Sequence, residues 1–142
     1  MNPNYCHTVT LYNRLKATDN LNMQDVWKRT VLQNCFYKAS TVQVQNNTNV
    51  SMSNTYTVRI PSDVRYLPYR AWKKLSDEER KSCFTVSEGD ILIYGECDEE
   101  ITGKSGNAAV QVMQRHKPDA FMVTSFSDNT RHLSGKHYRL GG

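Results

Sequence analysis

Hydrophobic and polar residues alternate with a period of two along much of the chain, which is the pattern of strands that bury one face. Within residues 5–13, for example, Val9 and Leu11 share a face. A high content of β-branched and aromatic residues predicts a second, longer strand that bends near Gln33 and Asn34. The strands predicted in this way cover residues 5–13, 25–39, 55–60, 89–97, 120–126 and 137–140.

Residues 39–58 contain no charged side chain and consist of short alternating flanks around a polar centre. Two strands joined by a polar turn fit this composition. We therefore expect a hairpin arm over about residues 40–57 that projects from the body of the protein. Its predicted tip consists of Asn46, Asn47, Thr48 and Asn49.

Two short helices are expected between the strands. Ser76 and Glu79 have the spacing of a capping box, which predicts a helix over residues 77–82 within a partly helical insertion at about 62–83. A second helix is expected over residues 107–115. The side chains expected to pack inward are Tyr66, Tyr69 and Trp72 of the insertion and Ala109, Val112 and Met113 of the second helix.

Strands dominate this pattern, and neither an internal repeat nor a domain boundary is visible. We therefore predict one mainly-β domain over residues 1–142, a small β-barrel or sandwich with a protruding hairpin and one or two short helical insertions. No apolar run approaches the roughly 18 residues of a membrane-spanning helix, so a membrane protein is not expected. The four cysteines form no Cys-x-x-Cys pair and follow no secretory segment, which favours a reduced, intracellular chain.

Catalytic, cofactor and metal sites are not predicted. Cys83 is the best candidate nucleophile, with a histidine partner to come from His116, His132 or His137, but no local signature accompanies it. Cys6 and His7 are adjacent, and adjacent strand residues point to opposite faces, so they do not form a metal-ligand pair. His132 and His137 are not predicted to bind a metal, because they lack a second pair of ligands. Three consecutive acidic residues, Asp98, Glu99 and Glu100, are typical of a solvated turn. The Gly103-Lys104-Ser105 triplet lacks the first glycine of a Walker A loop.

The net charge of +4 conceals three blocks of charge. Residues 1–76 carry ten basic and three acidic residues, residues 77–100 carry two basic and nine acidic, and residues 101–142 carry six basic and two acidic. Opposite blocks in one chain suit a head-to-tail interface between identical subunits. A nucleic-acid-binding β-barrel is the alternative from another class, with its best patch at Tyr66, Arg70, Trp72, Lys73 and Lys74. The acidic block argues against it, because it would repel phosphate.

Several segments, in this order, resemble the head-closure (head–tail connector, stopper) class of neck proteins of tailed phages and prophages. They are residues 9–13 (VTLYN), 27–35 (WKRTVLQNC), 56–61 (YTVRIP), 89–95 (GDILIYG) and 121–129 (FMVTSFSDN), followed by a basic strand at the end. The resemblance extends from residue 9 to residue 140. It implies a small β-barrel with an extended loop or hairpin and carries no catalytic residue.

The resemblance also implies a structural virion protein that forms a homo-oligomeric ring at the head–tail joint, assembled in the host cytoplasm. Such a ring continues the DNA channel below the portal or adaptor, docks the tail terminator or tail tube, and lets double-stranded DNA pass without sequence specificity. A tail-terminator or tail-completion role in the same neck is the alternative. The residues expected at the subunit interface or the lumen are Glu88, Asp90, Glu96, Asp98, Glu99 and Glu100.

Overall fold

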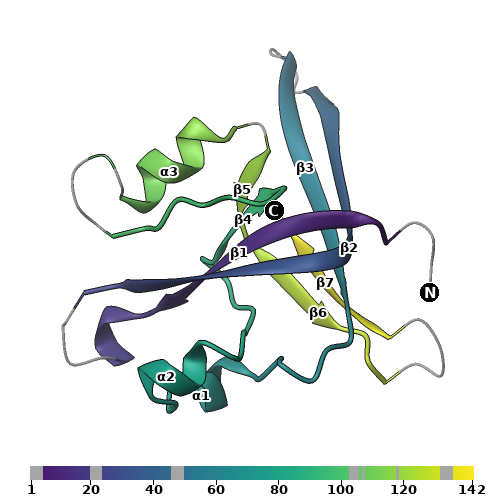
Figure 1. Ribbon diagram of the computed structural model, residues 1–142. Helices are drawn as coiled ribbons and strands as arrows, with labels where there is room; N and C mark the ends of the chain where they lie inside the picture. Colours follow the sequence, from purple (N-terminus) through teal and green to yellow (C-terminus); the bar gives the residue numbers. More distant parts are fainter. Residues whose placement is uncertain are drawn as a thin grey trace.

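The computed structural model describes residues 5–19, 24–45, 50–102, 106, 108–117, 119–131 and 136–142. Seven strands in this part of the chain form a single antiparallel sheet (Figure 1). They are β1 (His7–Leu15), β2 (Val26–Gln45), β3 (Val50–Pro61), β4 (Ile91–Tyr94), β5 (Ala120–Met122), β6 (Ser125–Asp128) and β7 (His137–Gly141). The helices are α1 (Tyr69–Trp72), α2 (Asp77–Arg80) and α3 (Ala109–Arg115), and a 3-10 turn spans Ala17–Asp19.

The sheet curls into a half-barrel with the strand order β5-β4-β1-β2-β3-β7-β6. Its two edge strands, β5 and β6, follow each other in sequence and are separated only by Val123 and Thr124. The Val123 amide donates to the Asp90 carbonyl at 2.7 Å, and the Thr124 amide donates to the Gly141 carbonyl at 2.8 Å. These two residues therefore link the edges, and the expectation of a mainly-β, barrel-like fold is confirmed.

Strand β2 takes part in both halves of the sheet because it bends at Asn34. Residues up to Cys35 pair with β1, whereas residues from Phe36 onward pair with β3. At the bend Asn34 has a φ of 59°, the left-handed conformation that asparagine tolerates better than most residues. The bend predicted near Gln33 and Asn34 is confirmed, and it directs the far half of β2 away from β1.

Both faces of β1 and β4 are buried along most of their length. The core inside the half-barrel includes Val9, Leu11 and Leu92, and a second cluster on the opposite face packs Tyr12 beneath α3. The sequence predicted one buried face for β1, and the second face is buried because α3 and the segment after β4 cover it. The inward residues predicted for the helix are confirmed, since Val112 is fully buried and Ala109 and Met113 pack against the same cluster.

The insertion between β3 and β4 packs as expected, but its helices differ from the prediction: α1 was not predicted, and α2 is shorter than the helix expected over residues 77–82. Trp72 is fully buried, and the Tyr66 ring centroid lies 4.2 Å from that of Tyr138. The capping box of Ser76 and Glu79 is present, but α2 ends at Arg80. Other observed bounds also differ from the predicted ones: α3 begins at Ala109, β4 covers only Ile91–Tyr94, and the strand predicted at 120–126 is divided into β5 and β6.

Candidate functional site

The hairpin of β2 and β3 extends beyond the rest of the sheet and forms an arm (Figure 1). We define the arm as residues 39–45 and 50–55. Among the described residues, β1 pairs with β2 only as far as Cys35, and β7 pairs with β3 only from Thr57 onward. The arm strands pair with each other through Gln45 and Val50, so each has one outer edge without a described strand neighbour. The predicted tip residues, Asn46, Asn47, Thr48 and Asn49, lie outside the described residues.

The acidic block places most of its carboxylates on the surface. Glu88, Glu96 and Asp98 are exposed. Glu100 is also exposed and accepts a bond from the Arg29 guanidinium at 3.1 Å, so part of the block is neutralised by a basic residue of β2. Glu99 is half-buried and pairs with Arg115 at 3.2 Å. These carboxylates are accessible, or partly accessible, to a neighbouring molecule.

Asp90 differs from the other residues of the block, and for this residue the predicted interface or lumen position is wrong. Its side chain is fully buried. The carboxylate accepts hydrogen bonds from the Arg14 amide at 2.9 Å, the Ser87 amide at 2.9 Å and the Asn13 side-chain amide at 3.0 Å. Burial raises the pKa of Asp90 to about 6, and these donors oppose the increase. Asp90 therefore joins β1 to the turn before β4 and has no surface left for a partner.

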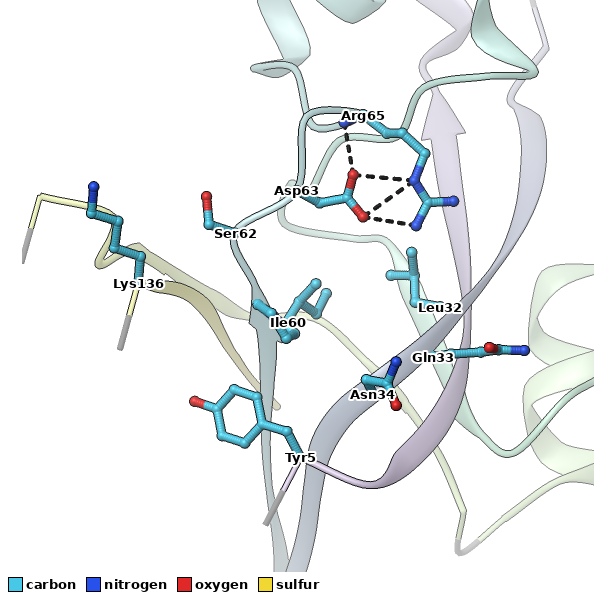
Figure 2. Close-up of a pocket in the computed structure, with 10 residues that line it drawn as sticks. Tyr5, Leu32, Gln33, Asn34, Ile60, Ser62, Asp63, Arg65 and Lys136 are labelled. Atoms are coloured by element: carbon cyan, nitrogen blue, oxygen red, sulfur yellow. Dashed lines mark hydrogen bonds and ion pairs between the residues drawn. The ribbon is translucent and has the colours of Figure 1, made fainter. Parts of the chain in front are cut away.

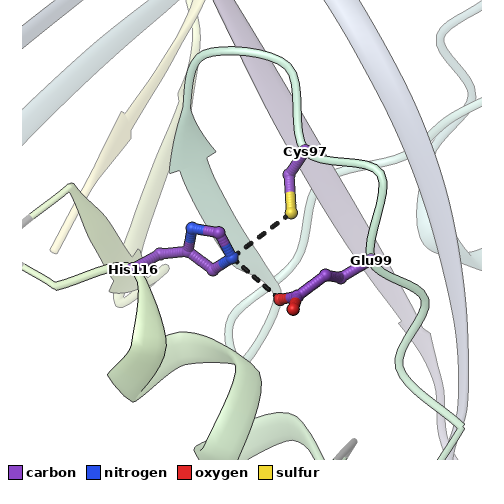
Figure 3. A group of neighbouring side chains, drawn as sticks. All are labelled: Cys97, Glu99 and His116. Carbon is purple, nitrogen blue, oxygen red and sulfur yellow. Dashed lines mark hydrogen bonds and ion pairs between the residues drawn. The ribbon is translucent and has the colours of Figure 1, made fainter.

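Three side chains with metal-binding chemistry meet between α3 and the segment that follows β4 (Figure 3). Cys97 Sγ lies 3.5 Å from His116 Nε2, and the same nitrogen lies 2.8 Å from Glu99 Oε2. Cys97 is buried, whereas Glu99 and His116 are half-buried. The hydrogen bonds from His116 and then Arg115 hold the pKa of Glu99 below its ordinary value. We refer to Cys97, Glu99 and His116 as the thiol cluster.

The backbone that carries Cys97 is fixed by bonds to β1 and β2. The Cys97 amide donates to Thr10 Oγ1 at 2.8 Å, and the Cys97 carbonyl accepts from the Arg29 guanidinium at 3.0 Å. The Tyr12 hydroxyl donates to the Glu99 carbonyl at 2.6 Å. Cys97 and Glu99 are two positions apart, and both side chains point toward His116 at the end of α3 (Figure 3). The thiol cluster is thus held by the sheet on one side and by the end of α3 on the other.

Sequence reasoning missed the thiol cluster. Cys97 was predicted at the end of the strand over residues 89–97, and Cys83 was the best candidate nucleophile, whereas the structure places Cys97 beside a histidine. The Cys-x-Glu spacing of Cys97 and Glu99 was the available local signal, but only the fold brings His116 to it. Of the other residues considered, His7 packs against Phe36 and Tyr94, and His132 lies outside the described residues.

The patch considered for nucleic-acid binding does not present its aromatic rings to solvent. Trp72 is fully buried, and Tyr66 packs within a group of rings that includes Phe84 and Tyr138. Arg70 and Lys74 are exposed. Since stacking on a base requires an accessible ring face, the patch offers charge without the stacking surface.

A pocket of about 360 Å³ lies where β2 bends and β3 ends (Figure 2). Its polar lining includes the ion pair of Asp63 and Arg65, with 2.8 Å between a carboxylate oxygen and a guanidinium nitrogen. Arg65 holds the pKa of Asp63 below its ordinary value. Because the charges of this pair are already matched, the pocket offers no unpartnered group at Asp63 or Arg65 to a charged ligand.

The fold and its sites define a mainly-β half-barrel with a projecting hairpin and a Cys/Glu/His cluster. No helix in the described part of the chain is long and apolar enough to cross a membrane. The model of a protein family described as a family of unknown function, DUF6751, matches residues 5–142, so the chain belongs to this family. Neither the curated proteins nor the solved structures contain a match.

Proposed function

We propose that the chain is a structural virion protein that forms a homo-oligomeric ring at the head–tail joint of a tailed phage. The ring would continue the DNA channel below the portal and dock the tail. The proposal is supported by the sequence resemblance over residues 9–140 and by the barrel-like fold with its arm. The arm is the observation that carries it.

The N–H and C=O groups at the outer edges of the two arm strands favour pairing with a further strand. From Ala39 to Gln45, β2 reaches about 20 Å at about 3.3 Å per residue. An outer strand edge presents N–H and C=O groups that another strand can pair with, and proteins protect such edges with charge, proline or a covering element. Residues 39–58 contain neither a charged residue nor a proline. Addition of a neighbouring subunit's strand would satisfy these groups.

The charge distribution supports a head-to-tail arrangement. Glu88, Glu96 and Asp98 are exposed, whereas residues 1–76 carry an excess of basic residues. In a heterologous interface each subunit presents one surface to a different surface of the next, and a suitable rotation closes the ring. The exposed acidic residues would then face either the basic surface of a neighbour or the DNA channel, where carboxylates keep phosphates from binding tightly.

Shortening the arm tests the proposal. Residues 40–55 are replaced by Asn-Gly, which forms a two-residue turn between the paired residues Ala39 and Tyr56. We expect the full chain to form rings on the portal protein encoded in the same genome, and the shortened chain to remain monomeric with an unchanged circular dichroism spectrum. Multi-angle light scattering measures the oligomeric state of both chains in the presence of portal.

A matched control places the same Asn-Gly turn at the tip of the arm, in place of residues 46–49, so that the paired strands Thr41–Gln45 and Val50–Asn54 are kept. This variant should still assemble. Equal assembly of the full and the shortened chains would contradict the role of the arm, and a full chain that remains monomeric with portal present would contradict the ring itself.

A further inference from the structure

The thiol cluster brings three donor atoms to one point. Cys97 Sγ, a Glu99 carboxylate oxygen and a His116 nitrogen all lie within 4.8 Å of one another. Both short contacts involve His116 Nε2, at 3.5 Å from the sulfur and 2.8 Å from the oxygen. We propose that the thiol cluster binds a zinc ion through Cys97, Glu99 and His116.

One proton on His116 Nε2 cannot form a full hydrogen bond to Cys97 Sγ and another to Glu99 Oε2. A neutral imidazole carries one proton, and at most one can sit on Nε2. A proton there that is donated to Glu99 leaves the thiol without an acceptor on the same nitrogen. A Ser-His-Asp-type relay uses both ring nitrogens, one for each partner, and here both partners approach the same one. A cation at the shared point would instead contact all three side chains.

The distances fit zinc. Zinc–sulfur and zinc–nitrogen bonds in a tetrahedral site place the two ligand atoms about 3.6 Å apart, and the observed separation of Cys97 Sγ and His116 Nε2 is 3.5 Å. The corresponding nitrogen–oxygen separation is about 3.3 Å, so Glu99 has to move by about half an ångström from its hydrogen-bonded position. Its side chain is 38% exposed and has room to do so.

The types of ligand favour zinc, and the surrounding contacts hold these ligands in place. A thiolate with an imidazole favours zinc over magnesium or calcium, which prefer oxygen ligands. Arg115 holds the other oxygen of Glu99 at 3.2 Å, and the Cys97 backbone is fixed by Thr10 and Arg29. Such contacts orient metal ligands and strengthen binding. The thiol proton is released to solvent when the metal binds, and water completes the fourth position.

Zinc binding would link the segment after β4, which carries Cys97 and Glu99, to His116 at the end of α3. This link would lie next to the buried residues Ile101 and Val112. The site would thus stabilise the part of the fold that carries the acidic residues Glu96, Asp98 and Glu100. This inference does not depend on ring formation, because all three ligands come from one chain.

Titration of the full chain with Zn²⁺ and Co²⁺ tests the site after dialysis against a chelator. We expect one metal ion per chain, a thiolate-to-cobalt charge-transfer band, and a higher melting temperature with zinc. Cys97→Ser should abolish the band and weaken zinc binding by about 100-fold or more, which exceeds the effect of removing a residue that only orients a ligand. The matched controls Cys83→Ser and His137→Gln should bind zinc like the parent chain.

Glu99→Gln and His116→Gln keep the test decisive if Cys97→Ser does not fold, because both side chains are partly exposed. Each should weaken zinc binding by about tenfold or more. The proposal is overturned if the parent chain shows no charge-transfer band with excess Co²⁺. It is equally overturned if the band persists in Cys97→Ser or if Glu99→Gln and His116→Gln bind zinc like the parent.

Discussion

Raising the pH from about 4 to 6 should destabilise the fold through one buried carboxyl group, Asp90. Burial raises the pKa of Asp90 from 3.8 to about 6 in the folded protein. Within this window the folded state binds more protons than the unfolded state, so the free energy of unfolding falls as the pH rises. The contribution is fully present below about pH 4 and is lost above about pH 6. At about 1.4 kcal/mol per pKa unit, the loss is about 3 kcal/mol.

Asp90→Asn isolates this effect because asparagine does not titrate. The variant is less stable overall, since its NH₂ group replaces an acceptor that faces donors from Asn13, Arg14 and Ser87. The quantity to follow is the difference in the free energy of unfolding between parent and variant, from urea denaturation at pH 4, 5, 6 and 7. We expect the advantage of the parent to shrink by about 2 kcal/mol between pH 4 and 7, because part of the loss has already occurred at pH 4.

Asp63→Asn provides a control of opposite sign. Arg65 lowers the pKa of Asp63, so the advantage of the parent over this variant should grow as the pH rises through the acid range. If the Asp90→Asn difference is constant or grows with pH, the hydrogen bonds to the carboxylate outweigh its burial, and the assignment of a raised pKa to Asp90 is refuted.

Three further substitutions test how the fold is held together, each measured by urea denaturation. Trp72→Ala should cost about 4 kcal/mol, because a fully buried indole anchors the insertion, and a loss below about 1 kcal/mol would contradict that role. Asn34→Val should cost about 1–2 kcal/mol because of the positive φ at the bend of β2, whereas Asn34→Gly should be nearly neutral, and equal effects would contradict the strain. Ser76→Ala should cost about 1 kcal/mol through loss of the capping box, and an unchanged midpoint would show that α2 does not contribute to global stability.

Local sequence patterns were sufficient to predict the features that depend on residues close together in the sequence. The bend of β2 followed from a polar pair of residues in a strand, and Asn34 adopts the left-handed conformation there. The capping box at Ser76 and the inward residues of α3 were likewise encoded by spacing within a few residues. The uncharged stretch at 39–58 predicted the arm. This prediction succeeded because the two arm strands are close in sequence and pair mainly with each other.

Features that depend on contacts between distant residues were not predictable from pattern alone. Asp90 looked like one more acidic residue near a turn, and its partners on β1 come from the other end of the chain. Cys97 and His116 are brought together because α3 packs over β4. Strand 120–126 divides at Val123 and Thr124 because the chain crosses there from one edge of the sheet to the other, which alternation of residue types does not reveal.

A reconstruction by electron microscopy of the full chain with the portal protein of the same genome would test whether the chain forms a ring. We predict a closed ring below the portal, with each arm paired to a neighbouring subunit and Glu88, Glu96 and Asp98 facing the channel or a basic surface. A chain that remains monomeric in the presence of portal, or a ring whose arms contact no neighbour, would contradict this prediction.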